Sequence, residues 1–391
     1  MAVNLTNADA ALKSYYIDAI TEQLNKKANP FLAQIEKTTN DVWGKDVRKL
    51  VQVGVNGGFG AGEEDGNLPS AEANRYVEFV TPLKNLYGTI EISDKAIRAS
   101  ENNAGAFVSL LNAEMEGLIK SSAYNFGRML FGDGTGTVAT IQAGNYDMCV
   151  LDTLQNISIG QVLEIADSNG NILTKYGKQR VISMCEADTT VTLEGVKLSM
   201  EEIDGQNYRF VIQGSSGKEI SGLAMIFDKM RPIYGNEREF KEYLCPVSES
   251  SSSTFTLDQL QSVIDSIERR SGYAPNFILC SLEVRRILQK LLSANNRNIE
   301  TMELNGGYKT MSYNGIPIVA DRFCPKKNLY LLNTNDFALH QLCDWQWLSD
   351  DDGRILKQVP GKPVYTATLV KYAELMCYNP SAQGLISNIT K

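Results

Sequence analysis

The chain has 391 residues, of which 43% are hydrophobic and 21% are charged. This composition is typical of a folded protein with two or three domains. It excludes an intrinsically disordered chain, and no apolar run approaches the roughly 18 residues of a membrane helix. The formal net charge of −8 argues against a protein that grips DNA phosphates through a basic patch, so any nucleic acid is expected to be enclosed rather than bound.

Residues 1–45 are interpreted as an N-terminal arm. Apolar side chains recur at helical spacing from Leu12 to Leu24, and the pattern breaks at Ala28-Asn29-Pro30. The segment from Phe31 to Trp43 has little periodicity of its own, as expected for an arm whose contacts lie elsewhere in the molecule. The first residues do not show the basic and apolar pattern of a signal peptide.

Residues 46–92 predict an extended β-loop. Alternating valines from Val47 to Val55 indicate an outgoing strand, which Leu50 interrupts. Strand-like runs follow at 75–80 and 87–92. Two strands of about eight residues each would carry the tip of the loop roughly 25 Å from its base.

The segment between these strands is rich in glycine and acidic residues. Six glycines occur from Gly54 to Pro69, and no Lys or Arg occurs from Gly54 to Asn74. Such a segment cannot form a core, so it is either disordered or lies on another subunit. The residues predicted to make inter-subunit contacts at its tip are Gly57, Gly58, Phe59, Gly60, Glu63, Glu64, Asp65 and Leu68.

Residues 93–136 are dominated by a long amphipathic helix, predicted over 94–131 with Ser93 as its cap. Its apolar stripe comprises Phe107, Leu110, Leu111, Met115, Leu118, Ile119, Phe126, Met129 and Leu130. The glycine-rich run 132–136 is a strong stop signal. The pattern therefore predicts a helix several times longer than average.

Residues 137–221 predict a small all-β insertion, because short strands alternate with turns such as Asp167–Asn171. Residues 222–347 predict an α/β unit, in which a buried strand at Phe277–Cys280 separates two amphipathic helices.

The helix caps in this α/β unit are well marked. Thr256 and Gln259 fit a capping box, Gly272 follows the first helix as a stop, and Ser281 is placed to cap the second helix. Residues 348–391 form a C-terminal segment that returns to strand character at 364–378.

Residues that carry chemistry are sparse. His340 is the single histidine and lies in a strand-like context, which argues against Ser–His or Cys–His hydrolysis and His-rich metal sites. The glycine-rich tip is no phosphate loop, because Asp65 replaces the third glycine and the acidic residues repel phosphate. The acidic turns 167–171 and 350–353 lack the glycine and glutamate of a calcium loop. No catalytic, cofactor-binding or metal site is predicted, and an enzyme is not expected.

The remaining polar and aromatic candidates favour packing roles. Seven scattered cysteines without a C-x-x-C pair are interpreted as reduced core thiols of a protein made in a cytoplasm. Trp345-Gln346-Trp347 could stack a sugar, although core packing is commoner for such residues. A carbohydrate-active or carbohydrate-binding protein that uses the β-insertion is thus the alternative from a different class.

Four segments, in this order, resemble the major capsid proteins of tailed bacteriophages, a fold shared with encapsulins. Asn29-Pro30-Phe31-Leu32-Ala33-Gln34-Ile35 resembles the arm, and Tyr87-Gly88-Thr89-Ile90-Glu91-Ile92-Ser93 resembles the return from the extended loop. Arg128-Met129-Leu130-Phe131-Gly132-Asp133-Gly134-Thr135-Gly136 resembles the end of the spine helix, and Gly315-Ile316-Pro317-Ile318-Val319-Ala320-Asp321-Arg322 resembles a strand of the axial domain. The resemblance covers most of the chain except residues 137–221.

The resemblance implies an α+β fold with an N-terminal arm, an extended β-loop, a peripheral domain with a long spine helix, an α/β axial domain and the small all-β insertion domain. It implies hexamers and pentamers of an icosahedral head that encloses double-stranded DNA, located in the virion after assembly in the host cytoplasm. The extended loop would lie across a neighbouring copy. Portal, scaffolding and decoration proteins would be the further partners. An encapsulin-type shell around cargo enzymes is the nearest alternative.

Two departures from the family lead to further expectations. Some members join subunits by a Lys–Asn isopeptide bond with the lysine in the extended loop. Here the tip lacks lysine, and Lys49 and Lys84 lie near its base, so no covalent cross-linking is expected. The arm begins within a few residues of Met1, so a separate scaffolding protein is expected.

Overall fold

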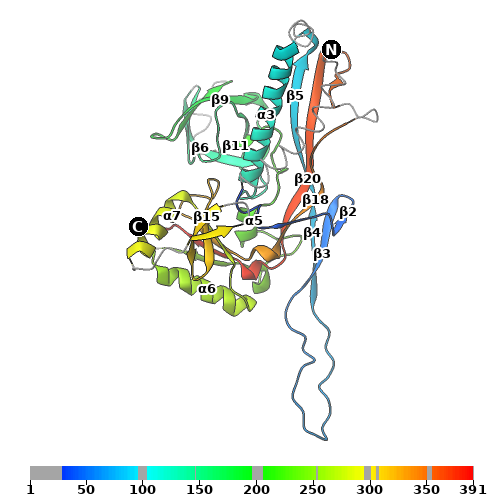
Figure 1. Ribbon diagram of the computed structural model, residues 1–391, viewed down its shortest axis with the longest axis vertical. Helices are drawn as coiled ribbons and strands as arrows, with labels where there is room; N and C mark the ends of the chain where they lie inside the picture. The colour runs from blue at the N-terminus through cyan, green and yellow to red at the C-terminus, as the bar shows by residue number, and fades with distance from the viewer. Residues whose placement is uncertain are drawn as a thin grey trace.

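The computed structural model describes residues 29–95, 104–145, 147–195, 206–251, 254–294, 301–304, 308–349 and 355–390. Figure 1 shows an elongated molecule in which a column of one helix and long strands stands beside a barrel and above an α/β unit. A two-stranded ribbon projects downward in this view, from the lower end of the column. The predicted helix before residue 28 and the acidic turn at 350–353 lie outside the described residues.

The column consists of an extended sheet and helix α3 (Ala104–Met129). The strands of this sheet are β1 (Glu36–Thr38), β18 (Phe337–Trp347), β20 (Val364–Cys377), β19 (Lys357–Gln358) and β5 (Lys84–Ser93). Strand β20 pairs antiparallel with both β5 and β18, and β1 joins β18 in parallel. Gly88 of β5 lets the helix approach closely, because a Cβ at this position would lie 2.8 Å from Leu118 Cδ1.

Helix α3 lies within the predicted range 94–131, and residues 94 and 95 are also helical. It ends at Met129, and residues 96–103 lie outside the described part of the chain. The chain after the helix turns away at Gly134 and Gly136, whose φ angles of 81° and 80° are readily adopted only by glycine. The predicted stop signal is therefore confirmed. The 26 residues of α3 span about 39 Å at 1.5 Å per residue.

The chain between α3 and helix α5 (Leu223–Phe227) forms a closed six-stranded barrel with its own core. Its strands are β6 (Thr137–Asn145), β7 (Met148–Leu151), β8 (Val162–Ala166), β9 (Gln179–Cys185), β10 (Thr190–Glu194) and β11 (Arg209–Ile212), and η2 (Thr174–Tyr176) connects β8 to β9. The predicted turn at Asp167–Asn171 is confirmed, since Asp167 Oδ1 accepts hydrogen bonds from the backbone N–H groups of Asn169 and Asn171 at 2.8 and 2.9 Å.

The α/β unit contains a seven-stranded sheet and two helices, α6 (Leu257–Ser271) and α7 (Leu282–Ala294). In spatial order the strands are β12 (Val247–Ser250), β21 (Gly384–Ser387), β17 (Leu329–Leu332), β13 (Phe277–Cys280), β16 (Ile316–Ala320), β15 (Tyr308–Tyr313) and β14 (Thr301–Leu304). Short 3₁₀ turns η3 (Glu242–Leu244), η4 (Thr334–Asp336) and η5 (Pro380–Ala382) complete this region.

The predicted N-caps and the glycine stop are confirmed, but the capping box is only half formed, because the side chain of Gln259 bonds Glu249 and Ser251 instead of turning back to Thr256 N. Thr256 Oγ1 accepts a hydrogen bond from Gln259 N at 3.2 Å, and Ser281 Oγ accepts one from Val284 N at 3.4 Å. Gly272 ends α6 in the left-handed conformation. The side chain of Gln259 donates to Glu249 at 2.8 Å, so it ties the helix to β12.

Strand β13 shows how one sheet serves two cores. Its side chains alternate between faces, as the period of a strand requires. Phe277 and Leu279 belong to the large core shared with the column, whereas Ile278 and Cys280 pack with helices α6 and α7. The α/β unit is therefore continuous with the column and does not have an independent core on that face.

Other local predictions have mixed outcomes. Trp345 and Trp347 are buried in the large core, as packing residues. His340 is buried, with Nδ1 3.0 Å from Asn40 O and Nε2 2.9 Å from the Tyr378 hydroxyl, and burial lowers its pKa. Cys149, Cys280, Cys324 and Cys377 are buried, but Cys185 is exposed on the barrel, so the prediction of a core thiol is wrong there.

In the described part of the chain, no helix has the length and apolarity needed to cross a bilayer.

Strand β20 carries a fully buried carboxyl group, Glu374. One oxygen accepts a hydrogen bond from Ser221 N at 2.6 Å and from Leu375 N at 3.2 Å. The other oxygen has no hydrogen-bond partner among the described residues. Burial penalises the charged form and raises the pKa of Glu374 from 4.5 to about 8.

This raised pKa predicts a stability that falls as pH rises. The unfolded chain ionises near pH 4.5, whereas the folded protein keeps Glu374 protonated up to about pH 8. The contribution of Glu374 to the free energy of unfolding is therefore fully present below pH 4.5. This contribution is lost as pH rises through 8, and the loss amounts to roughly 4–5 kcal/mol at 1.36 kcal/mol per pH unit. Glu374→Gln should stabilise the subunit against urea by several kcal/mol at pH 8.5 and have little effect at pH 4.5. Equal effects at both pH values would contradict the assignment, and the exposed Glu186→Gln serves as the control.

Candidate assembly interface

The extended loop is anchored to the body by a three-stranded sheet at its base. The strands are β2 (Val42–Trp43), β3 (Asp46–Gln52) and β4 (Tyr76–Pro82), paired antiparallel. Val47 and Phe79 are buried, and the ring of Phe79 lies 5.2 Å from that of Tyr234. The predicted interruption at Leu50 is wrong, because β3 runs through it and leaves its side chain exposed.

A segment far along the chain fixes one side of this base. Tyr234 O accepts a hydrogen bond from Val80 N at 3.1 Å, and Asn236 Nδ2 donates to Glu78 O at 2.9 Å. The buried guanidinium of Arg238 orders this segment by donating to the backbone carbonyls of Met225, Ile226, Arg231 and Leu244 at 2.8–3.0 Å. The ribbon therefore leaves the body from a rigid base.

Beyond the base, the contacts of the loop are local. Val53 N donates to Arg75 O at 2.8 Å, and the side chains of Asn56 and Asn74 are hydrogen-bonded at 2.9 Å. Gly66 N donates to Glu63 O at 3.1 Å. Figure 1 shows this part of the chain as a long excursion away from the body. The loop therefore has a defined course without support from a core of its own.

The structure brings all eight predicted contact residues together in this excursion. Gly58 is half-buried, and the other seven, Gly57, Phe59, Gly60, Glu63, Glu64, Asp65 and Leu68, are exposed. Large apolar side chains are among them, since Phe59 is 95% and Leu68 91% exposed, as is neighbouring Val55 at 91%. Burying one such side chain contributes about 1.5–3 kcal/mol, so contact with a partner would stabilise the tip.

The charged side chains of the tip are all acidic. Glu63, Glu64, Asp65 and Glu72 lie between Gly54 and Asn74, where the sequence has no Lys or Arg. At the base, Lys49 is engaged in an ion pair with Asp41 at 2.6 Å. A surface that covers the tip must therefore supply both apolar contacts and positive charge.

The described residues contain no candidate metal centre. No group of three His, Cys, Asp or Glu side chains in this part of the chain is placed to hold a metal ion. Sequence reasoning found the tip through its composition, but it missed the anchor at Tyr234, Asn236 and Arg238. No local signal could have revealed the contacts of Tyr234 and Asn236 with the loop base, because Val80 and Glu78 lie more than 150 residues away in the chain.

Comparison with solved structures decides the fold. A chain of the cyanophage A-1(L) capsid asymmetric unit superimposes with a TM-score of 0.59 at 12% identity, and the match covers 93% of both chains. This chain has the tailed-phage capsid fold. The α+β capsid fold predicted from the sequence is therefore confirmed.

Two further similar structures have TM-scores below 0.5. The SrpI encapsulin of Synechococcus elongatus PCC 7942 gives 0.47 at 10% identity, covering 93% of this chain and 89% of that one. The capsid of an empty GTA particle gives 0.49 at 10% identity, with coverage of 92% and 89%. The capsid fold assigned here rests on the cyanophage chain alone. No family model matches the chain, and no curated protein matches its sequence.

The half-buried lysines at the base of the loop, Lys49 and Lys84, lead to a prediction about covalent linkage. Because the tip lacks lysine and Lys49 is held by Asp41, subunits in assembled particles are expected to remain unlinked. Boiling in denaturant and electrophoresis should give a single band near 43 kDa. A ladder of higher bands that resists reducing agent would show covalent linkage and contradict the prediction.

Proposed function

We propose that this protein is a major capsid protein whose copies assemble into the hexamers and pentamers of an icosahedral phage head. The observation that carries the proposal is the capsid fold, matched over 93% of both chains. The projecting acidic and apolar loop supports it, because that loop lacks a core in its own chain and suits contact with another copy. The head would enclose double-stranded DNA, form part of the virion, and assemble in the host cytoplasm.

The loop suggests how assembly is driven. Laying the tip across a neighbouring copy would cover Val55, Phe59 and Leu68, which are almost fully exposed in the single subunit. Its rigid base would set the direction of the contact. The net charge of −8 suits a shell that encloses DNA without gripping it. A portal, a separate scaffolding protein and decoration proteins would complete the particle.

The experiment is to express the protein alone and with the scaffolding protein of its own genome, and to size the product. Megadalton particles with icosahedral symmetry in electron microscopy are expected. Persistent monomers under both conditions would contradict the proposal. Nuclease-protected DNA inside mature particles would separate a phage head from an encapsulin-type shell, which would instead contain cargo protein.

A further inference from the structure

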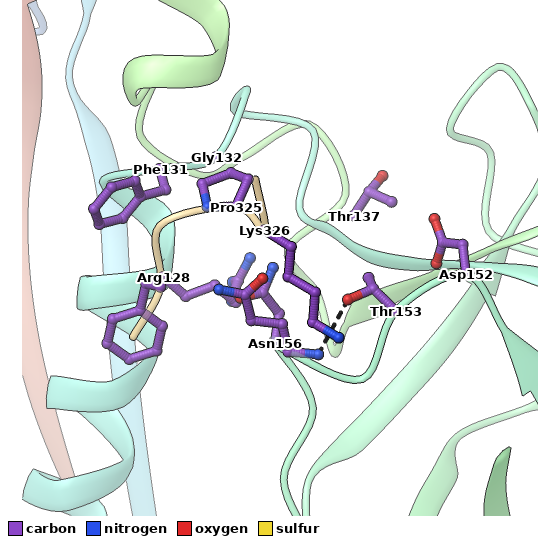
Figure 2. A pocket seen from close by; sticks show the side chains of 11 residues that line it. Arg128, Phe131, Gly132, Thr137, Asp152, Thr153, Asn156, Pro325 and Lys326 are labelled. Carbon is purple, nitrogen blue, oxygen red and sulfur yellow. Dashed lines mark hydrogen bonds between the residues drawn. The ribbon is translucent and has the colours of Figure 1, made fainter. Parts of the chain in front are cut away.

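A cavity of about 300 Å³ lies where three parts of the chain meet. It is bounded by the end of α3, the loop 152–156 of the barrel and the turn 323–326 that follows β16. Figure 2 shows Arg128 entering from α3, with Lys326 reaching toward Thr153 and Asn156 from the other side. The cavity volume is at the lower end of ligand pockets and is sufficient for one aromatic side chain.

The walls of this cavity are held in place before anything binds. Gln155 Nε2 donates to Arg322 O at 2.7 Å and to Cys324 O at 2.6 Å, which ties the barrel to the turn. Asp321 Oδ1 accepts a hydrogen bond from Phe323 N at 2.8 Å and fixes the turn. The shape of the cavity is therefore set by contacts between segments that lie more than 160 residues apart in the chain.

The rim of the cavity is cationic. Lys326 lines the cavity, and its exposed chain neighbours Arg322 and Lys327 add positive charge to the segment 322–327, which has no acidic residue. The guanidinium of Arg322, which does not itself line the cavity, stacks over the rings of Phe323 at 5.1 Å and Tyr124 at 5.0 Å. On the barrel side, Asp152 lines the cavity, and its carboxylate accepts a hydrogen bond from Thr140 N at 2.8 Å.

The interior combines apolar rings with unused polar atoms. Phe131 and Phe323 line it together with Pro325. Arg128 forms a buried ion pair with Glu219, yet its Nε has no hydrogen-bond partner among the described residues, and the same holds for Asn156 Oδ1. An occupant that presents an aromatic side chain to Phe131, Phe323 and Pro325 and a carboxylate to Lys326 would match this cavity.

We propose that this cavity is the docking site for the extended-loop tip of a second copy of the chain. The tip offers the complementary set: Phe59 as an exposed ring, and Glu63, Glu64 and Asp65 without any cation between Gly54 and Asn74. Within one copy the loop points away from the body, so the occupant comes from another copy (Figure 1). The inference rests on the proposed assembly and names the surface that receives the loop.

A charge-exchange series tests the pairing. Lys326→Glu/Lys327→Glu should reduce the yield of particles at least tenfold, as should Glu63→Lys/Glu64→Lys, and combining all four changes should restore most of the yield. The control, Lys178→Glu/Lys229→Glu, changes two exposed lysines away from the cavity and should assemble normally. Unchanged thermal unfolding of the subunits would show that each variant folds.

Photo-cross-linking then locates the contact. A benzophenone amino acid at position 59 should link to residues 128–156 or 322–327 of the neighbouring copy in assembled particles, as read by mass spectrometry. Wild-type particles whose yield is insensitive to the rim variants, or whose cross-links fall elsewhere, would overturn this inference and leave the proposed function intact. A wild-type protein that never assembles would instead overturn the proposed function.

Discussion

Replacing residues 55–73 by a short glycine-serine linker should leave the subunit folded and abolish shell formation. The removed segment lies beyond the strand pairing of β3 with β4, and its hydrogen bonds are local. Its loss should therefore change the free energy of unfolding by less than about 1 kcal/mol. Assembly should fail because the exposed apolar side chains and the acidic residues of the tip are gone together.

Two controls separate the chemistry of the tip from its length. A glycine-serine segment of the original length should also fail to assemble, because it keeps the reach but loses the side chains. Phe59→Ala alone should weaken assembly without abolishing it. Thermal unfolding and electron microscopy are the measurements. Normal shells from the shortened variant would show that the tip is dispensable and that the proposed contact is wrong.

Arg128→Met should destabilise the subunit by about 3–5 kcal/mol. Arg128 lies in the last turn of helix α3 and forms an ion pair with Glu219, with side chains only 2% and 3% exposed. Removing one partner leaves an uncompensated buried charge, which costs far more than the pair itself contributes. Unfolding in urea at pH 7 would measure the change.

The double variant Arg128→Met/Glu219→Leu is the informative comparison. It removes both charges and should recover most of the lost stability. Lys120→Met provides a matched control on the same helix, because its pair with Glu116 at 3.7 Å is exposed and should contribute less than about 0.5 kcal/mol. A loss of similar size in the control, or no recovery in the double variant, would contradict the assignment.

Much of the local structure could be predicted because its signals are local. Thr256 and Gly272 mark the ends of α6 through bonds within one turn of the helix. The buried run Phe277–Cys280 predicts its strand, although not that its two faces serve different cores. The tip was found because glycines and uncompensated acidic residues cannot form a core.

The interior of the candidate interface could not be predicted in the same way. The cavity depends on Gln155 meeting the carbonyls of Arg322 and Cys324, and the ion pair joins Arg128 to a residue 91 positions later. No sequence pattern around Glu374 indicates that its pKa is raised, because the rise comes from complete burial in the folded chain. Such features arise from long-range packing, for which neither spacing nor composition leaves a local trace.

The sequence by itself determined that the chain is a folded α+β protein with a long helix and an acidic, glycine-rich excursion. It also showed a single histidine and no recognisable catalytic motif. Helix caps, strand alternation and charge content act over a few residues, so they can be read directly. Only the tertiary structure decided that the insertion closes into a barrel and that β1 joins β18 in parallel. It alone placed a cavity lined by Lys326 beside the barrel, because each of these features depends on which distant segments share one surface.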